Sequence, residues 1–265
     1  MSGRTITVEA HGHTEILTLN RPEVLNALDS EMTGELNDYF ASLHDRTEVR
    51  VVLLRAAGRA FCAGYDINGW TADPDTSPAL HMWNIQTAIG SIMRRMRSCP
   101  QPIIALGHGA ACGGGFSLLL ASDVRYGSPS LKMNAAYIKI GLGGCDMGSS
   151  YFLPRLVGAS LASELILTGR FISAERARSA GLISEIVEEE KLLDHGLALA
   201  EEMLANSPNG LRLSKQLLNL NMDAPSLEAA MAIEDRQQVM LTMTADNLEA
   251  IRAFSEKRPP KYSGN

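Results

Sequence analysis

The chain has 265 residues and a formal net charge of −6, with 45% hydrophobic and 20% charged residues. This composition is typical of an ordinary globular protein with a sizeable core. The acidic balance argues against a general nucleic-acid or membrane-surface binder, because such proteins carry a basic excess.

The first half of the chain alternates predicted strands with predicted helices. Strands over 5–9 and 14–20 flank His11-Gly12-His13, which is a hairpin signal. Apolar residues at helical spacing predict a helix over 30–43, and the apolar run Val49–Arg55 predicts a buried strand. Further on we expect strands over 103–106, 123–126, 131–134 and 183–187, and helices over 81–97, 116–122, 148–156, 160–168 and 174–180.

The last third of the chain is predicted to be entirely helical, with helices over 191–205, 210–221, 226–243 and 245–257. The fold class is therefore α/β, with a core over 1–190 and a helical region over 191–265. No linker-like segment separates these two parts, so we expect one continuous unit.

Two glycine-bearing segments are the candidate functional motifs. Phe61–Ile67 (FCAGYDI) and Ala111–Phe116 (ACGGGF) each follow a buried strand and are rich in small residues. Glycine allows backbone angles that expose N–H groups to a ligand, and a helix that starts there leaves its first N–H groups unpaired. Two such segments side by side would aim two donors at one oxygen, which is an oxyanion hole. The alternative is that these glycines only permit tight packing of helix against strand.

Other common sites fit the sequence less well. The triple glycine is not a G-x-G-x-x-G fingerprint, and no Gly-Lys-Ser/Thr follows it as in a P-loop. The cysteines form no C-x-x-C pair and lie near no suitable histidine cluster, so neither a structural zinc nor a disulfide framework is expected; they are Cys62, Cys99, Cys112 and Cys145. No signal core or membrane span is evident, and we expect a cytoplasmic protein without a metal or redox cofactor.

Six segments spread over nearly the whole chain carry a family resemblance: NRPEVLNAL (20–28), FCAGYDI (61–67), HGAACGGGFSLLLASD (108–123), GLGGCDMGSSYFLPRLVG (141–158), LTGRFISAERARSAGLISEIV (167–187) and FSEKRPPKY (254–262). In order and spacing these segments resemble those of the crotonase (enoyl-CoA hydratase/isomerase) superfamily. The resemblance implies a spiral of ββα units followed by helices that mediate trimerisation. Members commonly form trimers or hexamers.

The resemblance also implies a substrate and a site. Members bind acyl-CoA thioesters, with coenzyme A as part of the substrate, and nearly all stabilise an enolate or a related oxyanion. The two donors would be the N–H groups of Tyr65 and Gly114. The substrate-binding positions would be Val24, Leu25, Ala27, Ala63, Asp66, Ile67, Gly113 and Leu142, with Phe254 and Lys257 reaching the coenzyme A of a neighbouring subunit.

This sequence departs from the family's hydratases at both acid–base positions. Hydratases use two glutamates, and the matching positions here are Ser117 and Tyr137. Serine is a poor base near neutral pH, and an unperturbed tyrosine has a pKa near 10, so Tyr137 fits a donor or a wall. Paired carboxylates that would activate water are therefore missing.

One carboxylate is well placed by the resemblance. Asp146 lies in a neighbourhood that holds a catalytic aspartate in dienoyl-CoA isomerases and in 4-chlorobenzoyl-CoA dehalogenase, if one residue is inserted before it. Its other interpretation is the N-cap of the following helix. A lone carboxylate beside an oxyanion hole can remove a proton and return it elsewhere, which is double-bond isomerisation.

The sequence therefore predicts an enoyl-CoA isomerase or an enoyl-CoA hydratase. A decarboxylase or dehalogenase remains an alternative, although the dehalogenase base would be a histidine where this chain has Gly90. A non-catalytic acyl-CoA-binding relative and a purely structural protein also remain open. Arg94, Arg95 and Arg97 form a basic group on one helix, which is either a solvated face or a phosphate site.

Overall fold

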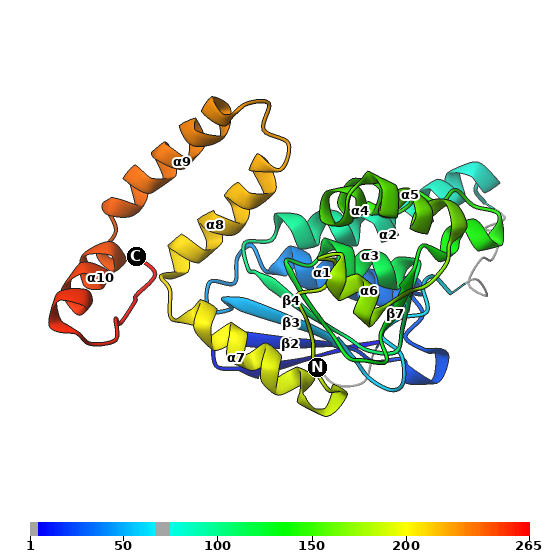
Figure 1. The fold of residues 1–265 in the computed structure, drawn as a ribbon, viewed down its shortest axis with the longest axis horizontal. Coiled ribbons are helices and arrows are strands. Elements are labelled where there is room, and N and C mark those ends of the chain that lie inside the picture. The colour runs from blue at the N-terminus through cyan, green and yellow to red at the C-terminus, as the bar shows by residue number, and fades with distance from the viewer. Residues whose placement is uncertain (1–4, 67–74) are drawn as a thin grey trace.

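The computed structural model describes residues 5–66 and 75–265, which form two β-sheets and the helices packed around them (Figure 1). The larger sheet has the strand order β1-β2-β3-β4-β6-β9, and the smaller one has the order β5-β7-β8. The strands are β1 (Ile6–His11), β2 (Thr14–Leu19), β3 (Val51–Ala56), β4 (Ile103–Gly107), β5 (Ala110–Cys112), β6 (Val124–Gly127), β7 (Lys132–Asn134), β8 (Ile172–Ser173) and β9 (Glu185–Ile186).

The chain passes repeatedly from the larger sheet to the smaller one. β4 is followed by β5 and β6 by β7, and within each sheet the successive strands β4 and β6, and β5 and β7, pair in parallel. Helix α3 (Gly114–Ala121) follows β5 directly. This arrangement confirms the α/β class and the ββα units that the resemblance implied.

The central strands β2, β3 and β4 are buried on both faces of the larger sheet because helices cover each face (Figure 1). Alternate residues of β3 divide between two apolar clusters, as the period of a strand requires. Val52 and Leu54 join the cluster that includes α1 (Ser30–Ser42), α2 (Pro78–Ser98) and α3. Val51 and Leu53 face α7 (Leu192–Leu204) on the other side.

The start of α2 shows how local chemistry shifts a predicted boundary. The helix begins at Pro78 and not at His81, because the Ser77 hydroxyl accepts a hydrogen bond from the Leu80 amide at 3.3 Å and proline fits the first helical position. Strands β5 and β8 were not predicted, since each has only two or three residues and β5 lies inside the glycine-rich segment.

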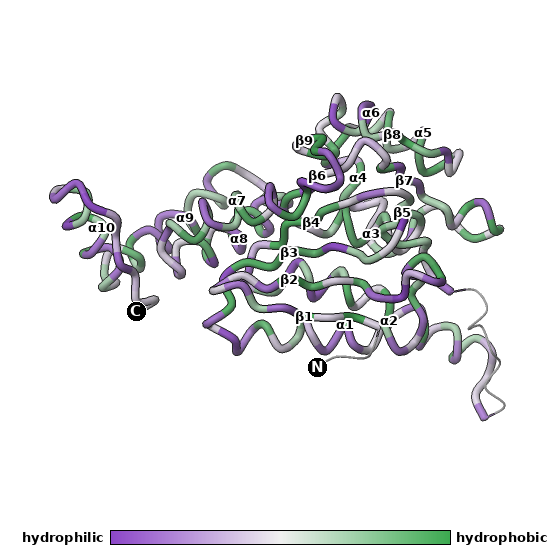
Figure 2. The backbone as a smooth tube through the Cα atoms, turned by 90° about the horizontal axis from the view of Figure 1, so that it is seen from below, coloured by the Kyte–Doolittle hydropathy of each residue, from purple (hydrophilic) through white to green (hydrophobic). Residues whose placement is uncertain are grey.

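The remaining helices lie over the smaller sheet or beyond the core. They are α4 (Ser149–Val157), α5 (Ala159–Thr168), α6 (Ala174–Ser179), α8 (Pro208–Asn221), α9 (Leu227–Thr242) and α10 (Ala245–Glu256), with the 3-10 turns η1 (Pro22–Val24), η3 (Ala136–Ile140) and η4 (Glu189–Lys191). Helices α8 to α10 extend away from the sheets, and green apolar stretches are visible along them in Figure 2.

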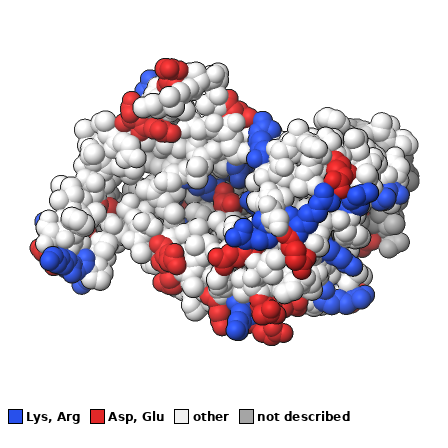
Figure 3. Space-filling view, viewed as in Figure 1, with Lys and Arg blue, Asp and Glu red and all other residues white. Residues whose placement is uncertain are grey.

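Basic and acidic side chains lie next to one another on the face seen in Figure 3. Within the part of the chain that the structure describes, no helix is both long enough and apolar enough to cross a bilayer.

Candidate functional site

One backbone bridge with two hydrogen bonds places the glycine-bearing segments side by side. Cys62, which belongs to no named strand, pairs in parallel with Ala111 of β5. The Cys62 amide donates to the Ala110 carbonyl at 3.1 Å, and the Cys112 amide donates to the Cys62 carbonyl at 2.9 Å. Tyr65 and Gly114 each lie three residues beyond this matched pair, so the pairing brings both positions to the same level.

The orientation of the Tyr65 amide follows from its neighbours. Leu28 donates to the Gly64 carbonyl at 2.7 Å and accepts from the Asp66 amide at 2.9 Å. Because amides alternate in direction along an extended segment, the Tyr65 N–H points away from Leu28. Gly64 has φ +102°, and a Cβ added there would lie 3.6 Å from the Gly114 nitrogen. The two segments are therefore in van der Waals contact at this point.

The Gly114 amide lies at the N-terminus of α3. The first helical hydrogen bond runs from the Ser117 amide to the Gly113 carbonyl at 3.0 Å, so the Gly114 amide precedes the helical ladder. Gly113 has φ +49° and ψ −113°, a backbone conformation that favours glycine. This turn presents the Gly114 N–H at the positive end of the helix dipole.

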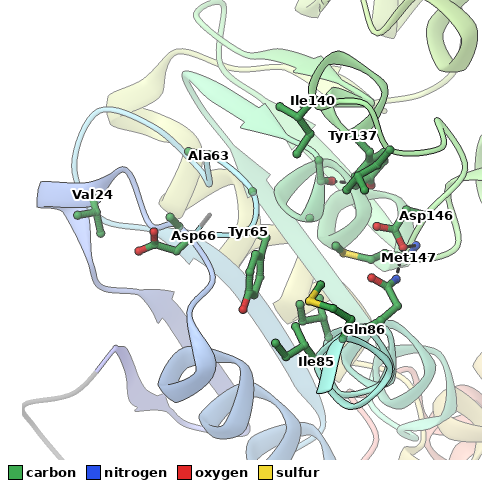
Figure 4. Close-up of a pocket in the computed structure, with 18 residues that line it drawn as sticks. Val24, Ala63, Tyr65, Asp66, Ile85, Gln86, Tyr137, Ile140, Asp146 and Met147 are labelled. Atoms are coloured by element: carbon green, nitrogen blue, oxygen red, sulfur yellow. Dashed lines mark hydrogen bonds between the residues drawn. The ribbon is translucent and has the colours of Figure 1, made fainter. Parts of the chain in front are cut away.

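A cavity of about 390 Å³ opens next to these amides, and Figure 4 shows the side chains around it. Ten of the fifteen site positions predicted from the sequence line this cavity. These ten are Val24, Ala27, Ala63, Tyr65, Asp66, Gly113, Gly114, Tyr137, Leu142 and Asp146.

The other five predicted positions lie elsewhere. Leu25 does not line the cavity, and Ser117 lies fully buried beneath it. Ile67 is outside the described residues. Phe254 and Lys257 lie at the exposed end of α10, on the part of the chain that extends from the core (Figure 1).

Asp146 lies on the cavity wall, half-buried, between α2 and the start of α4. Its carboxylate accepts a short hydrogen bond from the Gln86 side-chain amide and another from the Met147 amide at 2.7 Å. The N-cap interpretation is wrong, because α4 is capped by Gly148 and not by Asp146. The carboxylate is instead held at the cavity edge by one side chain and one backbone amide (Figure 4).

Ser117 and Tyr137 form a buried hydrogen-bonded pair behind the glycine turn. The Tyr137 hydroxyl donates to the Gly113 carbonyl at 2.8 Å, so the Ser117 hydroxyl, 2.5 Å from it, must donate to Tyr137. Burial raises the pKa of Tyr137 far above its ordinary value. Because Tyr137 stays protonated, it can hold the Gly113–Gly114 peptide in one orientation.

Several cavity residues were missed by the sequence analysis. Gln86, Ile85 and Ile89 come from the face of α2 that points toward the cavity, and Met147 has φ +45° at the turn after Asp146. A helical apolar pattern gives no sign of which face will border a cavity and which will border the core.

The cysteines are free thiols. Complete burial raises the pKa of Cys62 to about 12, so this thiol stays protonated next to the site. Over residues 5–66 and 75–265, no group of three or more histidine, cysteine or acidic side chains is placed to hold a metal ion.

Comparisons with known proteins agree with one another. The sequence model of the enoyl-CoA hydratase/isomerase family matches residues 11–265. The chain is 37% identical to "Probable enoyl-CoA hydratase EchA12" of Mycobacterium tuberculosis, over 98% of this chain and 93% of that one. It is 35% identical to 1,2-epoxyphenylacetyl-CoA isomerase of Escherichia coli, over 94% of each chain. The crystal structure of an enoyl-CoA hydratase from Bacillus anthracis superposes with a TM-score of 0.93, at 31% identity over 99% of this chain and 100% of that one.

Proposed function

Because the chain belongs to the enoyl-CoA hydratase/isomerase family and is an enzyme of that family, we propose that it binds an acyl-CoA thioester in the 390 Å³ cavity. The thioester oxygen would accept hydrogen bonds from the Tyr65 and Gly114 amides. These fixed donors would stabilise the negative charge that the oxygen gains when an enolate forms. One such donor is typically worth about 3 kcal/mol in the transition state.

The proposed reaction is migration of a carbon–carbon double bond, with Asp146 moving the proton. The Asp146 carboxylate takes a proton from the α-carbon of a 3-enoyl thioester, and the electron pair of that C–H bond moves into a dienolate held by the two amides. The protonated Asp146 then returns the proton to the γ-carbon, which gives the 2-enoyl thioester. No oxidant, reductant or co-reactant is required.

One observation carries this proposal. Asp66 and Asp146 are the acidic side chains among the described residues that line the cavity, and both positions that hold glutamates in hydratases lack a carboxylate. Asp66 lies 3.6 Å from the Arg21 guanidinium, whereas Asp146 is held by the neutral Gln86 amide and the Met147 backbone. Asp146 is therefore the better placed proton acceptor.

Hydration of a 2-enoyl thioester is the second candidate, because a relative 37% identical to this chain is named as a hydratase. In that reaction Asp146 would accept a proton from the attacking water as the water oxygen bonds to the β-carbon, and would then give that proton to the α-carbon of the enolate. The same oxyanion hole would serve, since addition to the β-carbon also passes through an enolate.

Ser117 and Tyr137 act in this proposal as positioning residues. The carbonyl of Gly113 and the amide of Gly114 belong to the same planar peptide, and they point in opposite directions. The hydrogen bond from Tyr137 to that carbonyl therefore fixes the direction of the catalytic N–H. Ser117 completes the chain of hydrogen bonds without reaching the cavity.

Substitution of Asp146 by asparagine tests the role of the carboxylate. Asparagine keeps the size of the side chain but cannot take the proton, so turnover of a 3-enoyl-CoA should fall by about 10²- to 10⁴-fold. Exchange of substrate protons with deuterium oxide should be lost as well. Asp194→Asn, an exposed change on α7, is the control and should retain the parent rate.

Assays with 3-enoyl-CoA and with 2-enoyl-CoA distinguish isomerisation from hydration. If 3-enoyl-CoA is converted and 2-enoyl-CoA takes up no water, the enzyme is an isomerase. Loss of the 2-enoyl substrate to a 3-hydroxy product would establish hydration instead. Proton exchange that persists in Asp146→Asn would remove Asp146 from the mechanism.

The proposed assembly is a homotrimer or a hexamer. Its support is the set of large apolar side chains that the extended helices α8 and α9 leave exposed in one chain: Leu218, Leu220, Leu227, Met231, Val239 and Met240. In such an assembly Phe254 and Lys257 would reach the coenzyme A of a neighbouring subunit. Light scattering coupled to size-exclusion chromatography tests it, and a monomer would contradict it. We further propose that the enzyme is cytoplasmic and needs no cofactor beyond the coenzyme A of its substrate.

A further inference from the structure

A second cavity adjoins the first. Its volume is about 630 Å³, and Gln86 and Met147 line both cavities. The partition between them is formed by side chains, because Gln86 reaches across from α2 to Asp146 (Figure 4). Gln86 is an exposed residue on α2, so its side chain has room to turn outward and join the two spaces.

The two cavities have opposite charge. The described residues around the first include Asp66 and Asp146 and no lysine or arginine. Those around the second include Arg94 and Arg97 and no aspartate or glutamate. A neutral hydrocarbon tail would gain nothing from two cations in its binding space, whereas an anionic group would.

Arg94 and Arg97 differ in how their charges are compensated. Arg97 lies 3.4 Å from the Asp123 carboxylate and stacks over the Phe152 ring at 5.5 Å. Arg94 donates to the Thr87 carbonyl at 3.1 Å and the Ser91 hydroxyl at 2.9 Å, both on its own helix. Among the ion pairs of the described residues, none includes Arg94.

Gly90 allows Arg94 to take this position. A Cβ added at Gly90 would lie 3.4 Å from one terminal nitrogen of Arg94, so the guanidinium lies over the bare backbone of α2. It reaches back toward Thr87, the residue after Gln86. The backbones of Gln86 and Arg94 are about 12 Å apart along the helix axis. Because the Arg94 side chain folds back toward Thr87, its guanidinium lies closer to Gln86, and so to the Asp146 carboxylate that Gln86 contacts, than this spacing suggests.

The floor of the second cavity is apolar. Met93 and Phe152 are buried there, and Tyr151 packs edge-on against Phe152 with ring centroids 5.1 Å apart. A cavity lined by apolar side chains and by the two arginines suits a ligand that has a hydrocarbon body and an anionic end.

We propose that the two cavities form one substrate site, and that the second takes the far end of an acyl group that terminates in a carboxylate. This inference rests on the proposed function, because the thioester must lie in the first cavity. The carboxylate would pair with Arg94, and the carbon chain before it would contact Met93 and Phe152 once Gln86 has turned aside.

Matched substrates test this inference. Two enoyl-CoA thioesters of equal chain length are compared, one ending in a carboxylate and one in a methyl group. The parent enzyme should have a higher kcat/KM for the carboxylate, and Arg94→Met should lower that value about tenfold, as expected for loss of one charge-assisted hydrogen bond. The value for the methyl-ended substrate should stay unchanged.

Arg95→Met is the control variant. Arg95 is an exposed neighbour on the same helix that lines neither cavity, so this change removes the same charge and should leave both values at the parent level. An equal loss in Arg94→Met and Arg95→Met would mean that only the overall charge matters, which would overturn the proposal.

Isothermal titration calorimetry with the saturated analogues of these two substrates distinguishes a failure of this inference from a failure of the proposed function. If both bind with the same dissociation constant, or the methyl-ended one binds more tightly, the carboxylate site is wrong while the acyl-CoA site stands. If neither binds, the proposed function fails, and this inference fails with it.

Discussion

Helix α2 borders both adjoining cavities, the first of which we propose as the reaction site and the second as a site for the far end of the acyl group. The first cavity is built from backbone amides, small residues and one available carboxylate, all held by hydrogen bonds to the protein. The second is lined by two arginines and by aromatic side chains, of which Trp83 is exposed and Phe152 is buried. Changes in the first should therefore lower kcat, because its contacts strengthen in the transition state, whereas changes in the second should raise KM.

After Asp146→Asn, the largest effect should come from Gly64→Ala. The added methyl group would lie 3.0 Å from the Cys112 carbonyl, and alanine is strained at φ +102°. The two segments must move apart, and we expect kcat to fall about 100-fold, the loss typical of one misplaced oxyanion donor. Gly12→Ala is the matched control, because Gly12 has φ +61° but no heavy atom within 4 Å of the added carbon. If both variants lose kcat equally, general strain and not the donor geometry explains the loss.

A smaller effect is expected for Tyr137→Phe. Phenylalanine leaves the Gly113 carbonyl with its helical partner Ser117 N–H only, and the buried Ser117 hydroxyl loses its acceptor. We expect unfolding to become easier by about 1–3 kcal/mol. At a temperature where the variant is fully folded, kcat should fall about tenfold with little change in KM.

This split between kcat and KM separates positioning from simple support of the fold. Urea denaturation measures the stability, and steady-state kinetics measure the two constants. A variant that loses stability but keeps the parent kcat would show that Tyr137 does not orient the Gly114 amide.

The smallest effect is expected in the second cavity, for Trp83→Ala. Trp83 is 66% exposed and lines the second cavity, so in our proposal it would cover a bound acyl group without being part of the core. KM for a long-chain substrate should rise a few-fold and kcat should stay the same, since the lost contact is shared by ground state and transition state. A short-chain substrate that ends within the first cavity is the control, and a rise in its KM as well would contradict the division between the cavities.

The sequence was informative where chemistry is local. The glycine-bearing segments around Tyr65 and Gly114 could be recognised because glycines after buried strands are a backbone signal. The family resemblance supplied Asp146 and most of the cavity wall. The alternative that Asp146 caps helix α4 was wrong, because Gly148 occupies the N-cap position of that helix.

The remaining features depend on residues far apart in the chain. Ser117 and Tyr137 are twenty residues apart, and only the fold shows that they bond to each other and to Gly113. The contact of Gln86 with Asp146 spans sixty residues. Periodicity identifies α2 as a helix but cannot show that Gly90 and Arg94 border a cavity, since solvated faces have the same pattern.

The most direct test is a crystal structure of the enzyme with an unreactive saturated acyl-CoA. The thioester oxygen should lie 2.7–3.1 Å from the backbone nitrogens of both Tyr65 and Gly114. A thioester that binds outside the first cavity, or an oxygen that reaches one of these amides but not the other, would contradict the account.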